Sequence, residues 1–272
     1  MEGGVDGANT ETVWEPLSLS DAFVYPLLLL GMYFLAALTY VIVSRIPAPF
    51  GKHVKKGWGP TIGVREGWII MESPALWATI LFFSMGENKL EFVPLVLLRL
   101  FQFHYFNRTL IYPIRMKVQG KGIPLVVVLC AFFFNLYNGY LQGRWLSHYG
   151  SYHDRSWLTT PQFLIGTLVF FTGFAINFWS DHILLSLRAD EHDRSYKIPR
   201  GFLYKYVTSP NYFGEIVEWL GWAILTWSPA GLAFFVYAVA NLAPRAVTTH
   251  QWYMTKFNDY PKERKYLVPG LY

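Results

Sequence analysis

Charged residues are scarce in this sequence. They make up 15% of the 272 residues, whereas an average soluble protein has about 25%. Hydrophobic residues make up 53% and aromatic residues 19%. The apolar residues gather in runs close to the roughly 20 residues that a helix needs to cross a bilayer. The composition therefore excludes an ordinary soluble domain and predicts an all-α, multi-pass membrane protein.

Cysteine is almost absent as well. With Cys130 as the single cysteine, an intrachain disulfide is excluded, and we expect this residue to be a small, buried part of the core. Neither a CxxC motif nor a His/Cys cluster predicts a metal site. The sequence also lacks a P-loop and the GxGxxG motif, so a bound dinucleotide would not be held by a Rossmann unit.

Basic residues are missing from the first 20 positions. A secretory signal peptide begins with a positively charged region, so we interpret the first apolar run as a retained membrane helix. Hydropathy predicts a non-membrane segment, residues 1–21, followed by a single membrane domain, residues 22–272. The seven expected spans are residues 22–43, 68–85, 92–111, 123–146, 161–187, 212–227 and 230–242. The last span is short, and the last two alternatively form one broken hairpin.

The basic residues are distributed unevenly between the two sides of this predicted bundle. When the loops are assigned alternately to two sides, all but four of the 23 Lys and Arg residues fall on one side. The positive-inside rule then places the C-terminus in the cytoplasm and the N-terminus outside or in a lumen. Both a bacterial inner membrane and the endoplasmic reticulum fit. Cytoplasmic loops explain the net charge of +5 without nucleic acid as a partner.

Several ionisable residues lie inside the apolar segments, near their cytoplasmic ends. Charged groups in hydrocarbon cost at least about 2.5–3.5 kcal/mol each on insertion scales, so such residues are typically functional. Glu72 lies one turn into the second segment. In the third segment, Tyr105, Arg108 and Tyr112 fall on one helical face. A carboxyl snorkelling to the interface and an aromatic belt are the structural alternatives.

Two further polar stripes lie on the fifth and sixth segments, and such stripes could face each other. Helical spacing groups Asn177, Asp181 and Arg188 on one helix, and Asn211, Glu215 and Glu218 on the next. Such stripes suit either the donors of a nucleotide or polar contacts between helices. The loop between them is basic and, together with Arg245, matches the oxygens of a phosphorylated ligand or of anionic lipid headgroups.

These residues stand in motifs that resemble the membrane steroid 5α-reductases (3-oxo-5α-steroid 4-dehydrogenases) from about residue 50 to residue 272. The matching stretches are GKH at 51–53, MESP at 71–74, HYFNRT at 104–109, NGYLQG at 138–143, SD at 180–181, LR at 187–188, SYKIP at 195–199, SPNYFGEIVEW at 209–219, HQWY at 250–253 and YP at 260–261. The stretch NYFGE is the most specific of them. The first 49 residues carry no motif.

The resemblance implies seven membrane helices around NADPH and reduction of the C4–C5 double bond of a 3-oxo-Δ4 steroid. It assigns Tyr105 and Glu72 to the catalytic pair that hydrogen-bonds the 3-oxo group. The cofactor-binding positions that it implies are Asn177, Asp181, Arg188, Tyr196, Lys197, Asn211, Glu215, Glu218, Arg245 and His250. Beside the substrate we expect Met71, Arg108 and Tyr112. Some family members have Gln where this chain has Met71. The methionine removes one possible polar contact and leaves the exact ketosteroid specificity open.

Three alternatives follow from the same features. A related membrane reductase of a long-chain enoyl-CoA or a polyprenol would use the same hydride chemistry. A membrane methyltransferase related to the isoprenylcysteine methyltransferases would share a remote C-terminal resemblance. A transporter would need a polar path through the bundle. In this sequence, the half of the predicted bundle away from the cytoplasm is almost wholly apolar. The implied partners are membrane lipids and a lipophilic small-molecule substrate.

Overall fold

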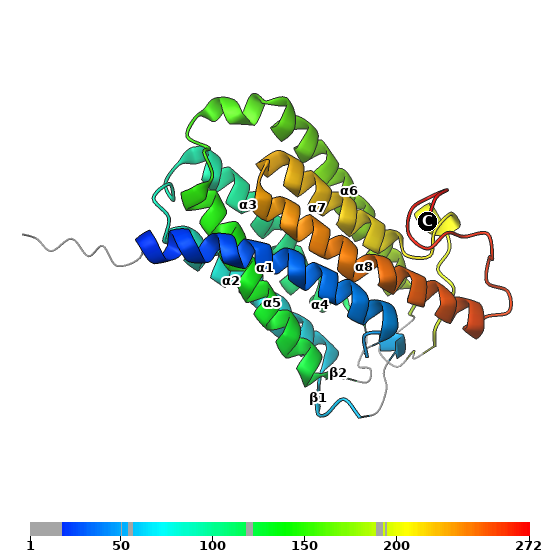
Figure 1. The fold of residues 1–272 in the computed structure, drawn as a ribbon. Coiled ribbons are helices and arrows are strands. Elements are labelled where there is room, and N and C mark those ends of the chain that lie inside the picture. Colours follow the sequence, from blue (N-terminus) through cyan, green and yellow to red (C-terminus); the bar gives the residue numbers. More distant parts are fainter. Residues whose placement is uncertain (1–17, 50, 54–56, 118–121, 189–192, 194) are drawn as a thin grey trace, which may run out of the picture.

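The computed structural model describes residues 18–272 except residues 50, 54–56, 118–121, 189–192 and 194. This part of the chain is a bundle of long helices (Figure 1). The helices are α1 (Ser18–Arg45), α2 (Val64–Ser84), α3 (Phe92–Phe106), α4 (Tyr112–Arg115), α5 (Leu125–Arg144), α6 (Pro161–Ser186), α7 (Pro210–Thr226) and α8 (Pro229–Lys256). Strands β1 (Thr61–Ile62) and β2 (Ile123–Pro124) form one short antiparallel pair at an end of the bundle.

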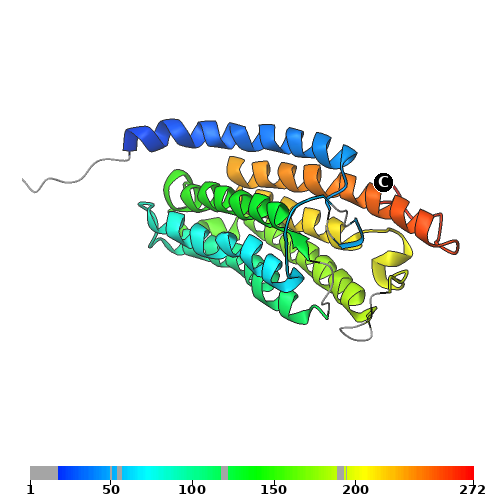
Figure 2. The ribbon, with the colours of Figure 1, turned by 90° about the horizontal axis from the view of Figure 1, so that it is seen from below.

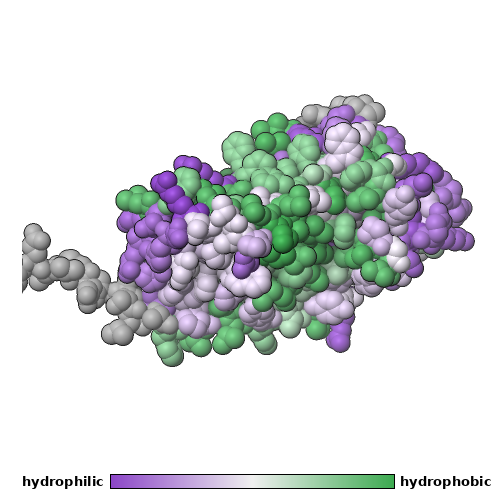
Figure 3. All heavy atoms as spheres, turned by 90° about the horizontal axis from the view of Figure 1, so that it is seen from above, coloured by the Kyte–Doolittle hydropathy of each residue, from purple (hydrophilic) through white to green (hydrophobic). Residues whose placement is uncertain are grey.

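Five helices in the described part of the chain are long and apolar enough to cross a membrane. They are Phe23–Arg45, Val64–Ser84, Leu125–Tyr149, Pro161–Ser186 and Pro229–Lys256. Hydrophobic side chains gather across the middle of the face seen in Figure 3, and hydrophilic side chains cover both of its ends. This distribution is that of an integral membrane protein, because the bilayer core favours apolar surface between two polar zones.

The helices pack in three main pairs: α2 with α5, α6 with α7, and α1 with α8. Figure 2 shows α1 along the outside of the bundle beside α8. Two expectations need correction here. Cys130 is exposed rather than buried, and it lies on the lining of the cavity described below. The chain also contains the β1–β2 pair, which hydropathy alone did not predict.

The last helix is much longer than hydropathy predicted. Residues 230–242 were the expected span, but α8 continues to Lys256. Hydropathy falls after Leu242 because polar residues such as Thr249 and His250 are buried against the rest of the bundle, where they do not meet lipid. Helices α7 and α8 are separate elements. Between them Trp227 adopts a left-handed conformation with φ 45°, which turns the chain.

Glycines bring α6 and α7 into backbone contact. A Cβ atom added to Gly173 would lie 2.2 Å from the backbone nitrogen of Glu218, and one added to Gly214 would lie 2.4 Å from that of Asn177. Such distances are far shorter than van der Waals contact, so only glycine allows this approach. The close packing fixes the rotation of the two helices and aligns the polar residues at their ends.

An aromatic cluster fills the centre of the bundle. The ring of Phe101 on α3 contacts Tyr105, Trp219 and Trp222 with centroid separations of 4.8–5.9 Å, and Trp219 packs on Phe234 of α8 at 4.3 Å. Aromatic contacts of this kind contribute about 0.5–1.5 kcal/mol each beyond simple burial. The cluster therefore forms a rigid support under the side chain of Tyr105.

Candidate active site

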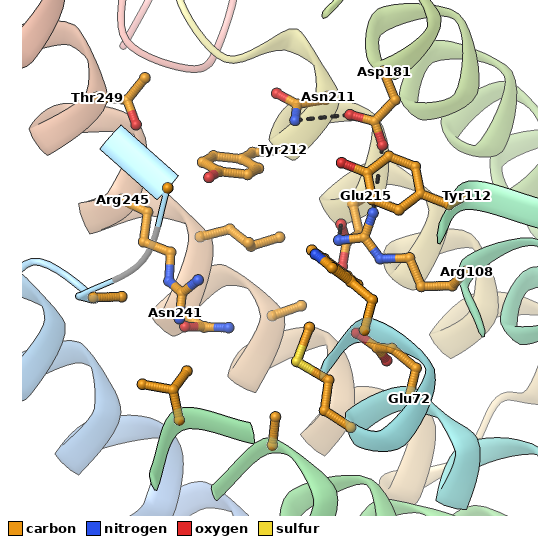
Figure 4. Close-up of a pocket in the computed structure, with 18 of the residues that line it drawn as sticks. Glu72, Arg108, Tyr112, Asp181, Asn211, Tyr212, Glu215, Asn241, Arg245 and Thr249 are labelled. Atoms are coloured by element: carbon orange, nitrogen blue, oxygen red, sulfur yellow. Dashed lines mark hydrogen bonds and ion pairs between the residues drawn. The ribbon is translucent and has the colours of Figure 1, made fainter. Parts of the chain in front are cut away.

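A cavity of about 510 Å³ lies between the helices, near the end where α4 and the second half of α8 are found (Figure 4). Its walls come from α2, α3, α5, α6, α7 and α8, and from the turn η1 (Gly51–His53) that follows α1. A volume of this size is ordinary for a site that binds a small molecule or cofactor. Six long helices thus meet around one space.

Arg108 organises one wall of the cavity. It lies on η2, a π-helical turn (Asn107–Ile111) that joins α3 to α4. Its guanidinium reaches Asp181 Oδ2 at 3.4 Å and Glu215 Oε2 at 3.5 Å, and it lies over the rings of Trp68 and Tyr112 at 4.5 and 5.1 Å. Figure 4 shows both carboxylates turned towards it. One cation therefore joins α6 to α7 across the cavity wall.

The predicted stripes on α6 and α7 do face each other. Asn177 Nδ2 donates to the backbone oxygen of Asn211 at 3.0 Å, and Asn211 Nδ2 donates to Asp181 Oδ1 at 3.1 Å. Because the glycines allow the backbones of α6 and α7 to approach closely, these hydrogen bonds form between a turn of α6 and the neighbouring turn of α7. The result is a fixed row of amide and carboxylate groups along the cavity wall.

Glu72 and Tyr105 lie on the same cavity from different helices. The Glu72 carboxylate accepts a hydrogen bond from Asn135 Nδ2 at 3.1 Å. Tyr105 is 3% exposed, its hydroxyl interacts with the side chain of Asn138, and it is close enough to Glu72 for a Coulombic interaction. The pair thus presents a partly buried carboxyl and a buried phenol to the cavity, and hydrogen bonds from such preorganised groups to a ligand that displaces water are strong.

Cationic and aromatic residues from η1, the loop after α6 and the end of α8 gather at one side of the cavity, its mouth. The Arg188 guanidinium lies 5.9 Å from the Tyr196 ring, Tyr196 packs on Trp252 at 4.9 Å, and Lys52 lies over Tyr253 at 4.9 Å. Burial lowers the pKa of Lys52 to about 7, and it also raises the pKa of Tyr196 above its usual value. Two loops and the end of α8 therefore meet around a basic entrance.

Most of the predicted site residues line this cavity. They are Met71, Glu72, Tyr105, Arg108, Tyr112, Asp181, Arg188, Tyr196, Asn211, Glu215 and Arg245. Four others lie off its lining. Asn177 holds the start of α7, and Lys197 bonds the oxygen of Leu187 in the loop at 2.8 Å. Glu218 pairs with His104 at 2.8 Å, and His250 bonds Thr208 at 2.6 Å. These four stabilise the walls.

Sequence reasoning missed several polar residues on the cavity, among them Lys52, Asn135, Tyr212, Asn241 and Thr249. Asn241 and Thr249 share a face of α8 with Arg245, as Figure 4 shows. Helical spacing would have grouped them, but the expected span ended at residue 242. Asn135 could have been recognised because it is a single amide residue in an otherwise apolar run. Lys52 lay in a loop outside every predicted span.

Comparisons with known proteins identify the family. A sequence model of the family described as 3-oxo-5-alpha-steroid 4-dehydrogenase matches residues 121–272. The chain is 46% identical to "Steroid 5-alpha-reductase DET2" from Gossypium hirsutum over 93% of its own length and 99% of that protein. It is also 39% identical to "3-oxo-5-alpha-steroid 4-dehydrogenase 1" from Bos taurus, over 93% of this chain and 97% of the relative. The chain therefore belongs to the 3-oxo-5-alpha-steroid 4-dehydrogenase family.

Proposed function

We propose that this protein reduces the C4–C5 double bond of a 3-oxo-Δ4 steroid with NADPH, giving the 5α-3-oxosteroid. Membership of the family supports steroid reduction as the reaction class. The observation that carries the residue assignment is the position of Glu72 and Tyr105 together on a cavity whose lining combines apolar side chains with charged ones. Glu72 and Tyr105 would bind a neutral carbonyl at one part of the lining, and the cations would bind an anionic cofactor at another.

The donor set fits a phosphorylated nicotinamide dinucleotide. Lys52, Arg188 and Arg245 supply cations on the lining, and guanidinium groups match phosphate oxygens bidentately. Asp181 and Asn211 supply acceptors on the opposite wall (Figure 4), which suit amide and hydroxyl donors. When bound, NADPH would supply the hydride that is transferred to C5. The cations would hold its phosphates, and the aromatic mouth would exclude water.

Tyr105 and Glu72 would polarise the 3-oxo group. As the hydride reaches C5, negative charge develops on the 3-oxygen, and both side chains would hydrogen-bond it. Each preorganised donor of this kind contributes about 2.7–4 kcal/mol to the transition state. A proton added at C4 then completes the reduction and restores the 3-oxo group. Met71 and Tyr112 line the adjoining surface, where the steroid skeleton would pack.

We further propose seven spans with the N-terminus outside and the C-terminus in the cytoplasm. From Phe92 to Arg115 the helical path through α3, η2 and α4 is continuous, long enough to cross a bilayer at 1.5 Å per residue. Helix α7 has 17 residues and packs along α6, so it would cross with it. This topology puts the basic mouth of the cavity on the cytoplasmic side, where NADPH would enter.

Purified protein in detergent tests the reaction directly. With NADPH and testosterone, we expect steroid-dependent oxidation of NADPH and a product heavier by two hydrogen atoms. NADH in place of NADPH would separate the two cofactors, and an added long-chain acyl-CoA would compete if an enoyl-CoA were the true substrate. NADPH binding without steroid turnover would refute the proposed substrate, and saturable binding of S-adenosylmethionine alone would refute the cofactor.

A further inference from the structure

The carboxyl of Glu72 is held by a residue that neither the motifs nor the proposed reaction uses. Asn135 lies on α5, is 5% exposed and lines the cavity. Its Nδ2 atom donates to Glu72 Oε2 at 3.1 Å and to the backbone oxygen of Met71 at 2.7 Å. The amide nitrogen of Asn135 thus donates both of its hydrogens to neighbouring acceptors on α2. A single side chain thereby fixes both the backbone and the carboxyl at this position.

The helix needs such a fixed point here. Pro74 lies two residues after Glu72 inside α2, and a proline has no N–H to donate to the carbonyl four residues earlier. That carbonyl belongs to Ile70 and accepts instead from Ser73 Oγ at 3.1 Å. The turn that carries Glu72 is therefore weakened within its own helix. The neighbouring side chain of Met71 cannot hydrogen-bond the carboxyl, so the restraint comes from α5.

The two carboxyl oxygens are consequently not equivalent. Oε2 accepts from Asn135, whereas Oε1 makes no hydrogen bond to any residue that the structure describes. The carbonyl oxygen of a protonated carboxyl accepts a hydrogen bond better than its hydroxyl oxygen does, so the bond from Asn135 to Oε2 favours the form of Glu72 that carries its hydrogen on Oε1. The free oxygen is then the one available to a ligand in the cavity.

We propose that Asn135 is a positioning residue, which fixes Glu72 so that the O–H on Oε1 donates a hydrogen bond to the 3-oxygen of the steroid. This inference rests on the proposed role of Glu72. Without Asn135 the carboxyl would rotate and carry its proton on either oxygen. The bound steroid would then meet a correctly placed donor only part of the time, while the cations at the cavity mouth would be unchanged.

Asn135→Leu, which has a similar size but no donor, and Asn135→Ala test the proposal. Loss of a hydrogen bond to a carboxyl group corresponds to a decrease in kcat of roughly 10- to 100-fold, with an unchanged Kd for NADPH. The wild-type protein should bind testosterone more tightly than a steroid that lacks the 3-oxygen. The ratio of these two Kd values should fall by a similar factor in the Asn135 variants. Thr79→Val is the matched control, because Thr79 is buried on α2 and its hydroxyl bonds only Ala75 in the helix.

A double-mutant cycle with Glu72→Gln separates positioning from a general structural role. If Asn135 acts through Glu72, Asn135→Leu should cause little further loss in the Glu72→Gln background. Equal losses in both backgrounds, or equally weakened binding of both steroids, would overturn the proposal. If Glu72→Gln alone lowers kcat while both Asn135 variants stay fully active, only the proposal fails. Full activity of Glu72→Gln would overturn the proposed function of Glu72 as well.

Discussion

Tyr105→Phe is the sharpest test of the proposed chemistry, because it removes one oxygen atom and preserves the ring. The ring contacts with Phe101, His104 and Trp219, at centroid distances of 4.8–5.9 Å, do not involve the hydroxyl. Phenylalanine should therefore occupy the same space in the aromatic cluster. The fold and the cofactor contacts at the other wall should remain intact.

The expected loss follows from the burial of the site. Tyr105 is 3% exposed, so water has no access to replace the missing donor. Removal of one donor from an oxyanion-type site lowers kcat by about 100- to 1000-fold. Glu72 would still supply its own hydrogen bond, which places the expected loss towards the lower end. The Kd for NADPH should stay within about twofold, since the hydroxyl bonds none of the cations.

Steady-state turnover with testosterone, followed by NADPH oxidation and product mass, measures this loss. Tyr152→Phe provides the control, since Tyr152 is equally buried and its hydroxyl donates to the oxygen of Thr226 at 2.5 Å, away from the cavity. That variant should lose stability but keep its kcat. A Tyr105→Phe enzyme with kcat near that of the wild type would refute the role of the hydroxyl. A parallel loss of NADPH binding would show that the ring, rather than the oxygen, matters.

Three further predictions concern the cavity walls and mouth. Because burial lowers the pKa of Lys52 to about 7, this cation is lost in the free enzyme as pH rises above 7. NADPH affinity should therefore decrease from pH 7 to 9, where the 2′-phosphate stays ionised, and Lys52→Arg should flatten a titration of Kd against pH. Arg108→Met leaves the buried carboxylate of Asp181 and the partly buried one of Glu215 without their cation and should destabilise the fold by about 3 kcal/mol, seen as a lower Tm. Arg108→Lys should lower the Tm by less, because it keeps a cation. Equal Tm values for the wild type, Arg108→Met and Arg108→Lys would contradict the ion-pair argument. Gly173→Ala forces α6 from α7 and should lower both Tm and NADPH affinity, whereas the exposed Thr172→Ala next to it should change neither.

Composition and periodicity alone determined the class of protein and the residues that share a helix face. The row from Asn177 to Asp181 and the row from Asn211 to Glu215 follow from 3.6 residues per turn, which is a local property of the chain. For the same reason, Tyr105, Arg108 and Tyr112 were grouped correctly even though a π-helical turn lies among them. Scarcity of charge predicted the membrane, since each charge in hydrocarbon is costly.

Only the tertiary structure decided which groups meet. Periodicity groups residues on one helix, but it does not give the rotation of one helix against another. Glu218 was grouped with Glu215, yet it points to His104 instead of the cavity. Asn135 reaches Glu72 because α2 packs on α5, a contact between positions 63 residues apart. The extension of α8 was hidden as well, since hydropathy detects helices that face lipid, whereas the second half of α8 buries polar side chains inside the protein.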